Sequence, residues 1–457
     1  MEGFLVKNRY QKGLIISLLS MIILMTFTNT SQRAYAQEDP LNIEADAAIV
    51  VEASTGKILY QKNIDTILGI ASMTKMMTEY LLLEAIDQKK VTWDQEYPVS
   101  DYVYKISQDT GLSNVPLVQD GKYTVKELYE AMAIYSANGA TIALAEVIAG
   151  SETEFVKMMN AKAKELGLKD YKFVNSTGLN NNSLYDMHPE GTSKSDENLM
   201  SARTTATLAY KLFNDFPEII NTASISKKVF REEGDYPIQM ANWNWMLPGL
   251  LYEYEGVDGI KTGFTDLAGY CFTSTAERDG MRYITVVMNA KSNGKSIPEA
   301  RFIETEKLLD YAFANFKIQE LYPEGYQIKK ESTFPVVKGK EKEIEVFTAN
   351  PIKTVIKNGE AEQFEPVFNI SEEVLTEDGA LTAPIKKDDV VGTMTVSYEG
   401  DNGYGFLTSE GEKTMQTDII TKTAVEKANW FVLMTRGIGG FFSDVWTSVS
   451  ETVKGWF

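Results

Sequence analysis

Three short motifs place a hydroxyl, an amine and an amide in an order that suits acyl transfer. They are SMTK at residues 72–75, SAN at 136–138 and KTG at 261–263. A serine hydroxyl is a weak nucleophile until a neighbouring base accepts its proton. Residues three apart lie on one face of a helix, so the amine of Lys75 can reach the hydroxyl of Ser72. The same helix N-terminus directs backbone N–H groups toward developing oxyanion charge.

The spacing Ser-x-x-Lys does not by itself identify a nucleophile. The same pattern begins at Ser54, Ser224 and Ser292. SAN alone is more often a turn that links two helices, and KTG alone also fits a solvated strand end with a glycine bulge. The order of all three motifs along the chain selects Ser72 as the candidate nucleophile.

Each motif offers groups with a definite chemical use. Lys75 can act as a base only if burial or a neighbouring cation lowers its pKa. Ser136 and Asn138 follow the helical pattern of 126–135, where a loop would offer a hydroxyl for proton relay and an amide for the substrate backbone. Lys261 and Thr262 suit a carboxylate, and the glycine after them permits close approach of a substrate along a strand edge.

Composition excludes several other classes of protein. The 457 residues include 64 acidic and 45 basic side chains, and the net charge of -19 would repel a phosphate backbone, so we expect no nucleic-acid partner. Cys271 is the one cysteine and His188 the one histidine, which argues against a disulfide framework and a zinc site. We expect His188 to be a loop residue and Cys271 a small buried apolar side chain, with no cofactor and no metal.

The patterns around the motifs predict a mixed sheet and helix domain. Residues 46–63 read as two strands that flank the turn at 54–56, and helical periodicity dominates from about 72 to 216. Three further strand patterns follow at 257–264, 269–277 and 281–290, and then a helical pattern at 299–316. Strands from both ends of this region would share one sheet, with helices on each side.

The two ends of the chain carry different signals. The N-terminus predicts a cleaved signal peptide over 1–36, because it has basic residues, an apolar run of about 15 residues and the small-x-small pattern ending at Ala36. An uncleaved transmembrane helix would need roughly 20 apolar residues, and this run is shorter. Short alternating runs over 318–417 predict a small all-β domain. Apolar residues at steps of three or four over 424–457 predict an amphipathic helix, which would lie on a membrane surface or dock on the β domain.

The motif order, together with GVDGIKTGFTDLAGYCFTSTA around the third motif, resembles the low-molecular-mass penicillin-binding proteins of the D-alanyl-D-alanine carboxypeptidase type. The resemblance covers nearly the whole mature chain. It implies an α/β (α+β) penicillin-binding, serine β-lactamase-like transpeptidase domain over 42–317, followed by the all-β domain and the C-terminal amphipathic helix. It also implies that the enzyme removes the terminal D-alanine from peptidoglycan stem pentapeptides through an acyl-enzyme, during cell-wall maturation.

The resemblance implies roles for nine residues. Ser72 would be the nucleophile and Lys75 its proton acceptor, and Ser136 and Lys261 would take part in proton relay and substrate binding. The substrate-binding residues would be Lys261, Asn138, Thr262, Gly263, Phe264 and Arg301, with the N–H groups of Ser72 and Phe264 as the oxyanion hole. β-Lactams would bind covalently, and the protein would be exported to the outer face of the cytoplasmic membrane and held there by its C-terminal helix.

Several alternatives share these motifs. An endopeptidase or transpeptidase acting on crosslinks would use all three, and a non-catalytic wall-binding or β-lactam-sensing protein would keep the scaffold. The deacylating Glu-x-x-Leu-Asn element of class A β-lactamases is absent, so we expect a bound β-lactam to persist as an acyl-enzyme. We transfer no role within the polar string 180–198. Trp243 and Trp245 could line the cleft, but we favour packing in the core or a loop.

Overall fold

The computed structural model describes residues 39–234, 236–329, 331–400 and 403–434. The predicted signal peptide lies outside these residues, and so does the predicted C-terminal helix from residue 435 onward. Both therefore stay predictions.

A five-stranded antiparallel sheet joins the two ends of the predicted enzyme domain, as the sequence predicts. Strand β1 carries the sequence AAIVVE and all its residues are buried, which explains why it lies inside the sheet. It pairs with β12 from Ala47 opposite Met288 to Glu52 opposite Tyr283. The order is β10-β11-β12-β1-β2, with β10 at one edge. The bounds are Ala47–Glu52 (β1), Ile58–Lys62 (β2), Val257–Thr265 (β10), Gly269–Arg278 (β11) and Met281–Ala290 (β12).

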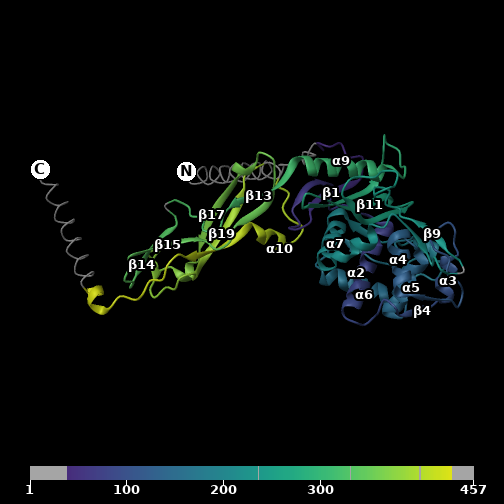
Figure 1. Cartoon of the computed structure of the whole chain (residues 1–457), viewed down its shortest axis with the longest axis horizontal. Helices are drawn as coiled ribbons and strands as arrows, with labels where there is room; N and C mark the ends of the chain where they lie inside the picture. The colour runs from purple at the N-terminus through teal and green to yellow at the C-terminus, as the bar shows by residue number, and fades with distance from the viewer. Residues whose placement is uncertain (1–38, 235, 330, 401–402, 435–457) are drawn as a thin grey trace, which may run out of the picture. The chain divides into compact units, whose positions relative to one another are not determined.

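Helices cover both faces of this sheet (Figure 1). Helix α9 (Ala300–Asn315) lies along one face against β11 and β12, and α7 (Ala202–Asp215) lies on the other against β1 and β12. The side chain of Ser201 accepts a hydrogen bond from the N–H of Thr204 and so fixes the start of α7. This arrangement confirms the predicted layers.

The helical region next to the sheet carries the first two motifs. Thr124 and Glu127 form a reciprocal capping box that fixes the start of α4, which ends immediately before Ser136. The helices pack around a second apolar core that includes Leu82, Leu128 and Leu144. The elements are η1 (Ala71–Thr74), α2 (Lys75–Asp87), α3 (Asp101–Ser107), α4 (Val125–Tyr135), α5 (Asn138–Ala149), α6 (Glu152–Glu165) and α8 (Ile220–Ala223).

Short strands interrupt this region, and the helical periodicity did not predict them. The most important for the site is β7 (Leu199–Ser201). It pairs with β3 (Ile67–Gly69), the strand that precedes η1 in the chain. The others are β6 (Tyr171–Lys172), which also pairs with β7, β4 (Glu96–Pro98) with β5 (Lys122–Thr124), and β8 (Lys227–Phe230) with β9 (Ile238–Ala241). Each has only two to four residues, too few to show an alternating pattern.

The following segment is all-β in character, as predicted. A six-stranded sheet has the order β17-β19-β20-β15-β14-β18, and β13 pairs separately with β16. Its core includes Val346, Met394 and Ile419. The strands are β13 (Phe316–Tyr322), β14 (Thr333–Val337), β15 (Glu343–Thr348), β16 (Ile352–Lys357), β17 (Phe364–Ile370), β18 (Leu381–Thr382), β19 (Val390–Tyr398) and β20 (Gln416–Thr421).

The predicted helix over 424–457 is wrong at its beginning. Val425 and Lys427 form β-bridges to Ile385 and Gly339, and the side chain of Val425 is buried in the β-domain core. Helical backbone begins only at residue 430, where the side chain of Asn429 accepts a hydrogen bond from the N–H of Val432. These first residues therefore form β-bridges in place of the helix that their apolar spacing predicts. Within the described part of the chain, no helix has the length and apolar character needed to cross a membrane.

Candidate active site

Two glycines allow distant segments to pack closely against the backbone around Ser72. Ser72 lies in the 3-10 turn η1, after Ala71, whose φ is 46°. A Cβ on Gly178 would lie 1.8 Å from the carbonyl oxygen of Ala71, and a Cβ on Gly263 would lie 2.8 Å from the carbonyl oxygen of Ile70. Two distant segments therefore approach the nucleophile turn more closely than any side-chain-bearing residue permits.

Lys75 is arranged to accept the proton of Ser72. Its Nζ lies 2.9 Å from Ser72 Oγ, 2.9 Å from Asn138 Oδ1 and 2.7 Å from the carbonyl oxygen of Thr177. The side chain is 1% exposed. Burial, and then the positive charge of Lys261, hold the pKa of Lys75 well below its ordinary value, while Glu152 acts in the opposite direction.

The hydrogen-bond partners of Lys75 also fix where its lone pair points. The oxygens of Asn138 and Thr177 only accept, so a neutral amine donates its two N–H bonds to them. Its lone pair is then left for the hydroxyl of Ser72. This geometry is that of a general base beside a nucleophile.

Ser136 and Asn138 occupy the junction between α4 and α5. Ser136 ends α4 in the left-handed region, with φ at 59°, and Asn138 is the first residue of α5. The backbone N–H and the Nδ2 of Asn138 both donate to the carbonyl oxygen of Ser113, at 2.9 and 3.0 Å. SAN is therefore a turn that links two helices and at the same time a part of the cavity wall.

Lys261 and Thr262 lie on the edge strand β10, as predicted. Lys261 is 5% exposed, and burial, followed by the positive charge of Arg301, lowers its pKa to about 7; the carboxylate of Glu79 acts in the opposite direction. Thr262 pairs with Phe272 of β11, which leaves the other edge of β10 open for a substrate backbone.

Arg301 approaches the site from α9. Its Nη1 donates to the carbonyl oxygen of Gly263 at 3.3 Å, and burial lowers its pKa to about 10. Its Nε has no hydrogen-bond partner within the described residues. A buried cation with an unused donor is suited to a carboxylate.

These residues surround one cavity of about 320 Å³. Phe264 is 48% exposed there, and its ring stacks on Tyr270 at a centroid distance of 4.3 Å. Lys75 and Lys261 are buried and do not line the cavity themselves. Lys75 is connected to it by the hydrogen bond with Ser72. Of the predicted site residues, the cavity is lined by Ser72, Ser136, Asn138, Thr262, Gly263, Phe264 and Arg301.

The two tryptophans combine both of the positions considered for them. Trp243 and Trp245 both line the cavity. The indole N–H of Trp243 donates to the carbonyl oxygen of Tyr135, at the end of α4, and Trp245 packs against Phe302 of α9. Both rings therefore pack against the protein, as favoured, and also line the cavity.

Sequence reasoning also missed the segment 175–179. Thr177 supplies the third partner of Lys75, and Asn175 Oδ1 accepts from the N–H groups of Thr177 and Gly178 at 3.1 and 2.7 Å. Buried Glu152 accepts from the backbone N–H and the hydroxyl of Ser176. The Ser-Thr-Gly sequence was the available signal for a tight turn, but nothing in it pointed to Lys75.

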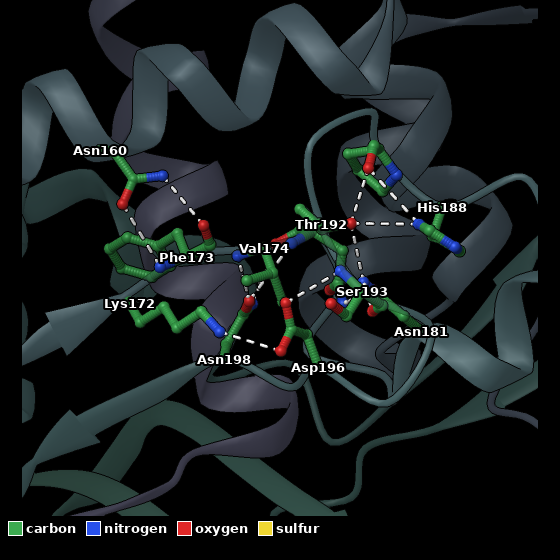
Figure 2. Close-up of polar contacts among 12 residues, drawn as sticks. Asn160, Lys172, Phe173, Val174, Asn181, His188, Thr192, Ser193, Asp196 and Asn198 are labelled. Carbon is green, nitrogen blue, oxygen red and sulfur yellow. Dashed lines mark hydrogen bonds and ion pairs between the residues drawn. The ribbon is translucent and has the colours of Figure 1, made fainter.

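The polar string after this segment is tied together by hydrogen bonds (Figure 2). His188 is a loop residue, as expected, and its Nδ1 lies 3.1 Å from Thr192 Oγ1. Asn181 Nδ2 donates to the same oxygen at 2.9 Å. Lys172 pairs with Asp196 at 2.9 Å. The string is thus a loop held together by its own polar contacts.

The other Ser-x-x-Lys matches lack this geometry. In the described residues, Ser72 and Lys75 are the pair joined through hydroxyl and amine. Lys57 instead donates to the carbonyl oxygen of Val355 at 2.7 Å, and Ser292 and Lys295 form a β-bridge in a turn. Cys271 is buried, as expected, and burial raises the pKa of its thiol to about 11, which suits a structural rather than a reactive thiol.

A buried lysine beside a serine at a helix start, a Ser-x-Asn turn and an edge-strand Lys-Thr-Gly define the class of penicillin-binding serine enzymes. Comparison with known proteins agrees with this class. Residues 32–292 match the family model of D-alanyl-D-alanine carboxypeptidase, and residues 316–427 match that of the penicillin-binding protein 5 C-terminal domain.

Relatives and solved structures resemble the chain over most of its length. It is 34% identical over 433 residues to D-alanyl-D-alanine carboxypeptidase DacF of Bacillus subtilis, covering 94% of this chain and 98% of that one. It is 28% identical to DacC of Escherichia coli over 437 residues, 95% and 94% of the two chains. A solved peptidoglycan synthesis regulatory factor (PBP3) from Streptococcus pneumoniae superposes with a TM-score of 0.66 at 35% identity, over 84% of this chain and 99% of that one.

The chain therefore belongs to the D-alanyl-D-alanine carboxypeptidase family of low-molecular-mass penicillin-binding proteins. It is a serine-type hydrolase with carboxypeptidase activity in cell-wall peptidoglycan metabolism.

Proposed function

We propose that Ser72 carries the acyl group when this enzyme removes the terminal D-alanine from a stem pentapeptide. The observation that supports this most directly is the 2.9 Å separation of Lys75 Nζ and Ser72 Oγ, with the two N–H bonds of a neutral Lys75 directed elsewhere. Ser72 Oγ attacks the carbonyl carbon between the two D-alanines, and Lys75 accepts its proton. The N–H groups of Ser72 and Phe264 stabilise the oxyanion.

The remaining site residues then complete the reaction. The proton passes from Lys75 through Ser136 to the leaving nitrogen, and D-alanine departs with its carboxylate held by Lys261, Thr262 and Arg301. Gly263 lets the substrate backbone lie along β10, and Asn138 Nδ2 faces its amide. A water then attacks the ester with Lys75 again as base, which restores the hydroxyl of Ser72. No cofactor enters these steps.

β-Lactams should acylate Ser72 by the same attack, with the ring nitrogen as leaving group. No carboxylate stands in a Glu-x-x-Leu-Asn context to activate a deacylating water, so the ester should persist. Mass spectrometry of the protein after penicillin exposure, with the modified peptide sequenced, tests the assignment. Ser72→Ala should lose both the label and D-alanine release, whereas Ser54→Ala and Ser292→Ala should keep both. A fully labelled Ser72→Ala protein would exclude Ser72 as the nucleophile.

A crosslink-cleaving endopeptidase or a transpeptidase would use the same catalytic residues. The cavity of about 320 Å³ is lined by the cationic Arg301, which favours a substrate that ends in a free carboxylate. The products from a defined pentapeptide and from a crosslinked dimer separate these activities. Release of D-alanine from the pentapeptide at a much higher rate than dimer cleavage is the expected result.

We further propose that the protein is exported by the signal peptide at 1–36 and held at the outer face of the cytoplasmic membrane by its C-terminal segment. The enzyme would occupy 42–317 and the β-rich domain 318–417. At the start of the C-terminal helix, Trp430 is 73% exposed, and Phe431 and Met434 are also exposed. Exposed aromatic and Met side chains on a helix suit the interface of a bilayer.

A further inference from the structure

Two neighbouring residues at the end of the polar loop reach the two halves of the catalytic machinery. They are Glu197 and Asn198, which directly precede β7. Both are buried, and neither lines the cavity. Their contacts go in different directions, one toward the nucleophile turn and the other toward the end of β10.

Asn198 forms hydrogen bonds on both sides of Ser72 in the turn η1. Its Nδ2 donates to Thr74 Oγ1 at 2.9 Å, and its backbone oxygen accepts from the N–H of Ile70 at 3.2 Å. Its Oδ1 accepts from the N–H groups of Val174 and Asn175, at 2.6 and 3.2 Å (Figure 2). Ile70 and Thr74 lie on either side of Ser72. One side chain with its backbone therefore fixes both ends of the turn that carries the Ser72 N–H.

Glu197 holds the end of β10. Its Oε2 accepts from the hydroxyl of Thr265 at 2.7 Å, and its Oε1 accepts from Asn180 Nδ2 at 3.0 Å. The Thr265 oxygen in turn accepts from the N–H of Ala268 at 3.0 Å, so the turn after β10 is tied to the same carboxylate. Thr265 directly follows Phe264, whose N–H is the second donor of the proposed oxyanion hole.

The oxyanion hole needs its two donors at a fixed separation, but they come from segments far apart in sequence. One lies in η1 and the other on β10. The β3–β7 pairing places Glu197 and Asn198 beside the chain that leads into η1, and Gly69 of β3 packs closely on Ala268. Two adjacent residues therefore connect both donor segments to one short piece of backbone.

We propose that Glu197 and Asn198 are positioning residues that set the distance between the Ser72 and Phe264 N–H groups and so tune the oxyanion hole. This role rests on the proposed function, because it requires Ser72 as the acylated residue. It predicts that breaking the Glu197 to Thr265 hydrogen bond slows the formation of the tetrahedral intermediate without weakening the binding of the substrate.

Thr265→Val is the sharpest test, because it removes the hydroxyl and keeps the shape of the side chain. The acylation rate by a penicillin and kcat for a D-alanine-terminated peptide should fall about tenfold with KM nearly unchanged, since small displacements of catalytic groups carry costs of this order. Thr265→Ser restores the hydroxyl and should stay within about twofold of the parent. Asp196→Asn is the matched control, because Asp196 lies in the same loop but pairs with Lys172.

The infrared carbonyl band of the penicilloyl ester separates positioning from general loss of stability. Hydrogen bonds from an oxyanion hole weaken the carbonyl bond, so Thr265→Val should shift the band to higher wavenumber, whereas Asp196→Asn should leave it unchanged. Glu197→Met, which has the length of Glu but no acceptor oxygen, should give the same shift as Thr265→Val, and the double variant should be no slower than Glu197→Met alone, because both changes remove the Glu197 to Thr265 hydrogen bond. If Thr265→Val does not fold, Glu197→Met carries the same measurement.

Two outcomes would overturn the proposal: an unshifted carbonyl band in Thr265→Val, or a loss of rate no larger than that of Asp196→Asn. Failure of the proposed function gives a different result, because the parent protein would then carry no penicilloyl group on Ser72 at all.

Discussion

Lys261, proposed above to hold the substrate carboxylate, is a buried amine. We expect Lys261→Met to lower kcat/KM about a hundredfold, because the variant loses a charged partner of the substrate carboxylate. We also expect it to unfold less readily at pH 7 than the parent. The two effects have opposite signs and a common cause, which is the burial of an ammonium group.

The size of the stabilisation follows from the pKa of Lys261. Its ordinary value is 10.5, and burial lowers it to about 7 in the folded protein. A shift of one unit corresponds to about 1.4 kcal/mol, so at pH 7 the buried lysine costs on the order of 4 kcal/mol relative to a neutral side chain. The pKa of about 7 already includes the opposing attraction of Glu79. Lys261→Met also loses the hydrogen bond from Nζ to the carbonyl oxygen of Thr262, so we expect a net gain of about 2 to 4 kcal/mol.

The gain should depend on pH in a definite direction. Between pH 7 and 10.5 the unfolded chain binds the lysine proton and the folded protein does not, so the parent becomes more stable as the pH rises through this window. The advantage of Lys261→Met is thus full at pH 7 and below and shrinks toward zero near pH 10.5. Denaturant midpoints of the full chain at pH 7 and 10 measure it. The exposed Lys126→Met is the control and should change stability by less than about 0.5 kcal/mol.

A lower midpoint for Lys261→Met at pH 7, or a gain that persists at pH 10, would contradict this reasoning. Either result would mean that Lys261 is compensated in the folded state by charges or water beyond the contacts described above. Unchanged activity would instead contradict the assignment of KTG to the substrate carboxylate.

Three further predictions follow from the same contacts. Glu79→Gln removes a negative charge that raises the pKa of Lys261, so the alkaline limb of the kcat/KM profile against pH should move to lower pH; an unmoved limb would show that another group controls it. Deletion of 430–457 should release the protein from membranes with near-parent turnover. Deletion of 424–457 should also lower the stability of the β domain by about 1 to 3 kcal/mol, because Val425 is buried there. Membrane sedimentation and thermal unfolding of the two truncations distinguish these effects, and equal stability of the two would contradict the role of Val425. Gly178→Ala should reduce penicillin acylation strongly, because its Cβ would meet the carbonyl oxygen of Ala71 at 1.8 Å, and Gly167→Ala, which also has positive φ but nothing within 4 Å, should not.

The sequence predicts the sheet and the three motifs well, because each leaves a local pattern. Strands β10, β11 and β12 are long runs with turn residues between them, and α9 has regular apolar spacing. Ser72 and Lys75 lie within one helical turn, so their meeting is a local property. Motif order then identifies their partners on α5 and β10 without any knowledge of the distances between them.

The remaining site residues were hidden because their roles depend on backbone atoms and on long-range contacts. Thr177 acts through its carbonyl oxygen, which every residue possesses, so no side-chain pattern could reveal it. Gly178 matters because it approaches Ala71, a contact between segments about a hundred residues apart. The short strand β7 was invisible for a related reason, since its stability comes from β3 and not from its own sequence.

The chemistry of this site therefore needs more than the motif residues. In the proposed mechanism Lys75 can act as a base because Asn138 and Thr177 accept its two N–H bonds and burial disfavours its charge. The motif supplies the amine and the hydroxyl, whereas segment 175–179 supplies the orientation of the lone pair. A chain that kept SMTK, SAN and KTG but lost the tight turn at Gly178 would keep the groups and lose the geometry that makes Lys75 accept a proton from Ser72.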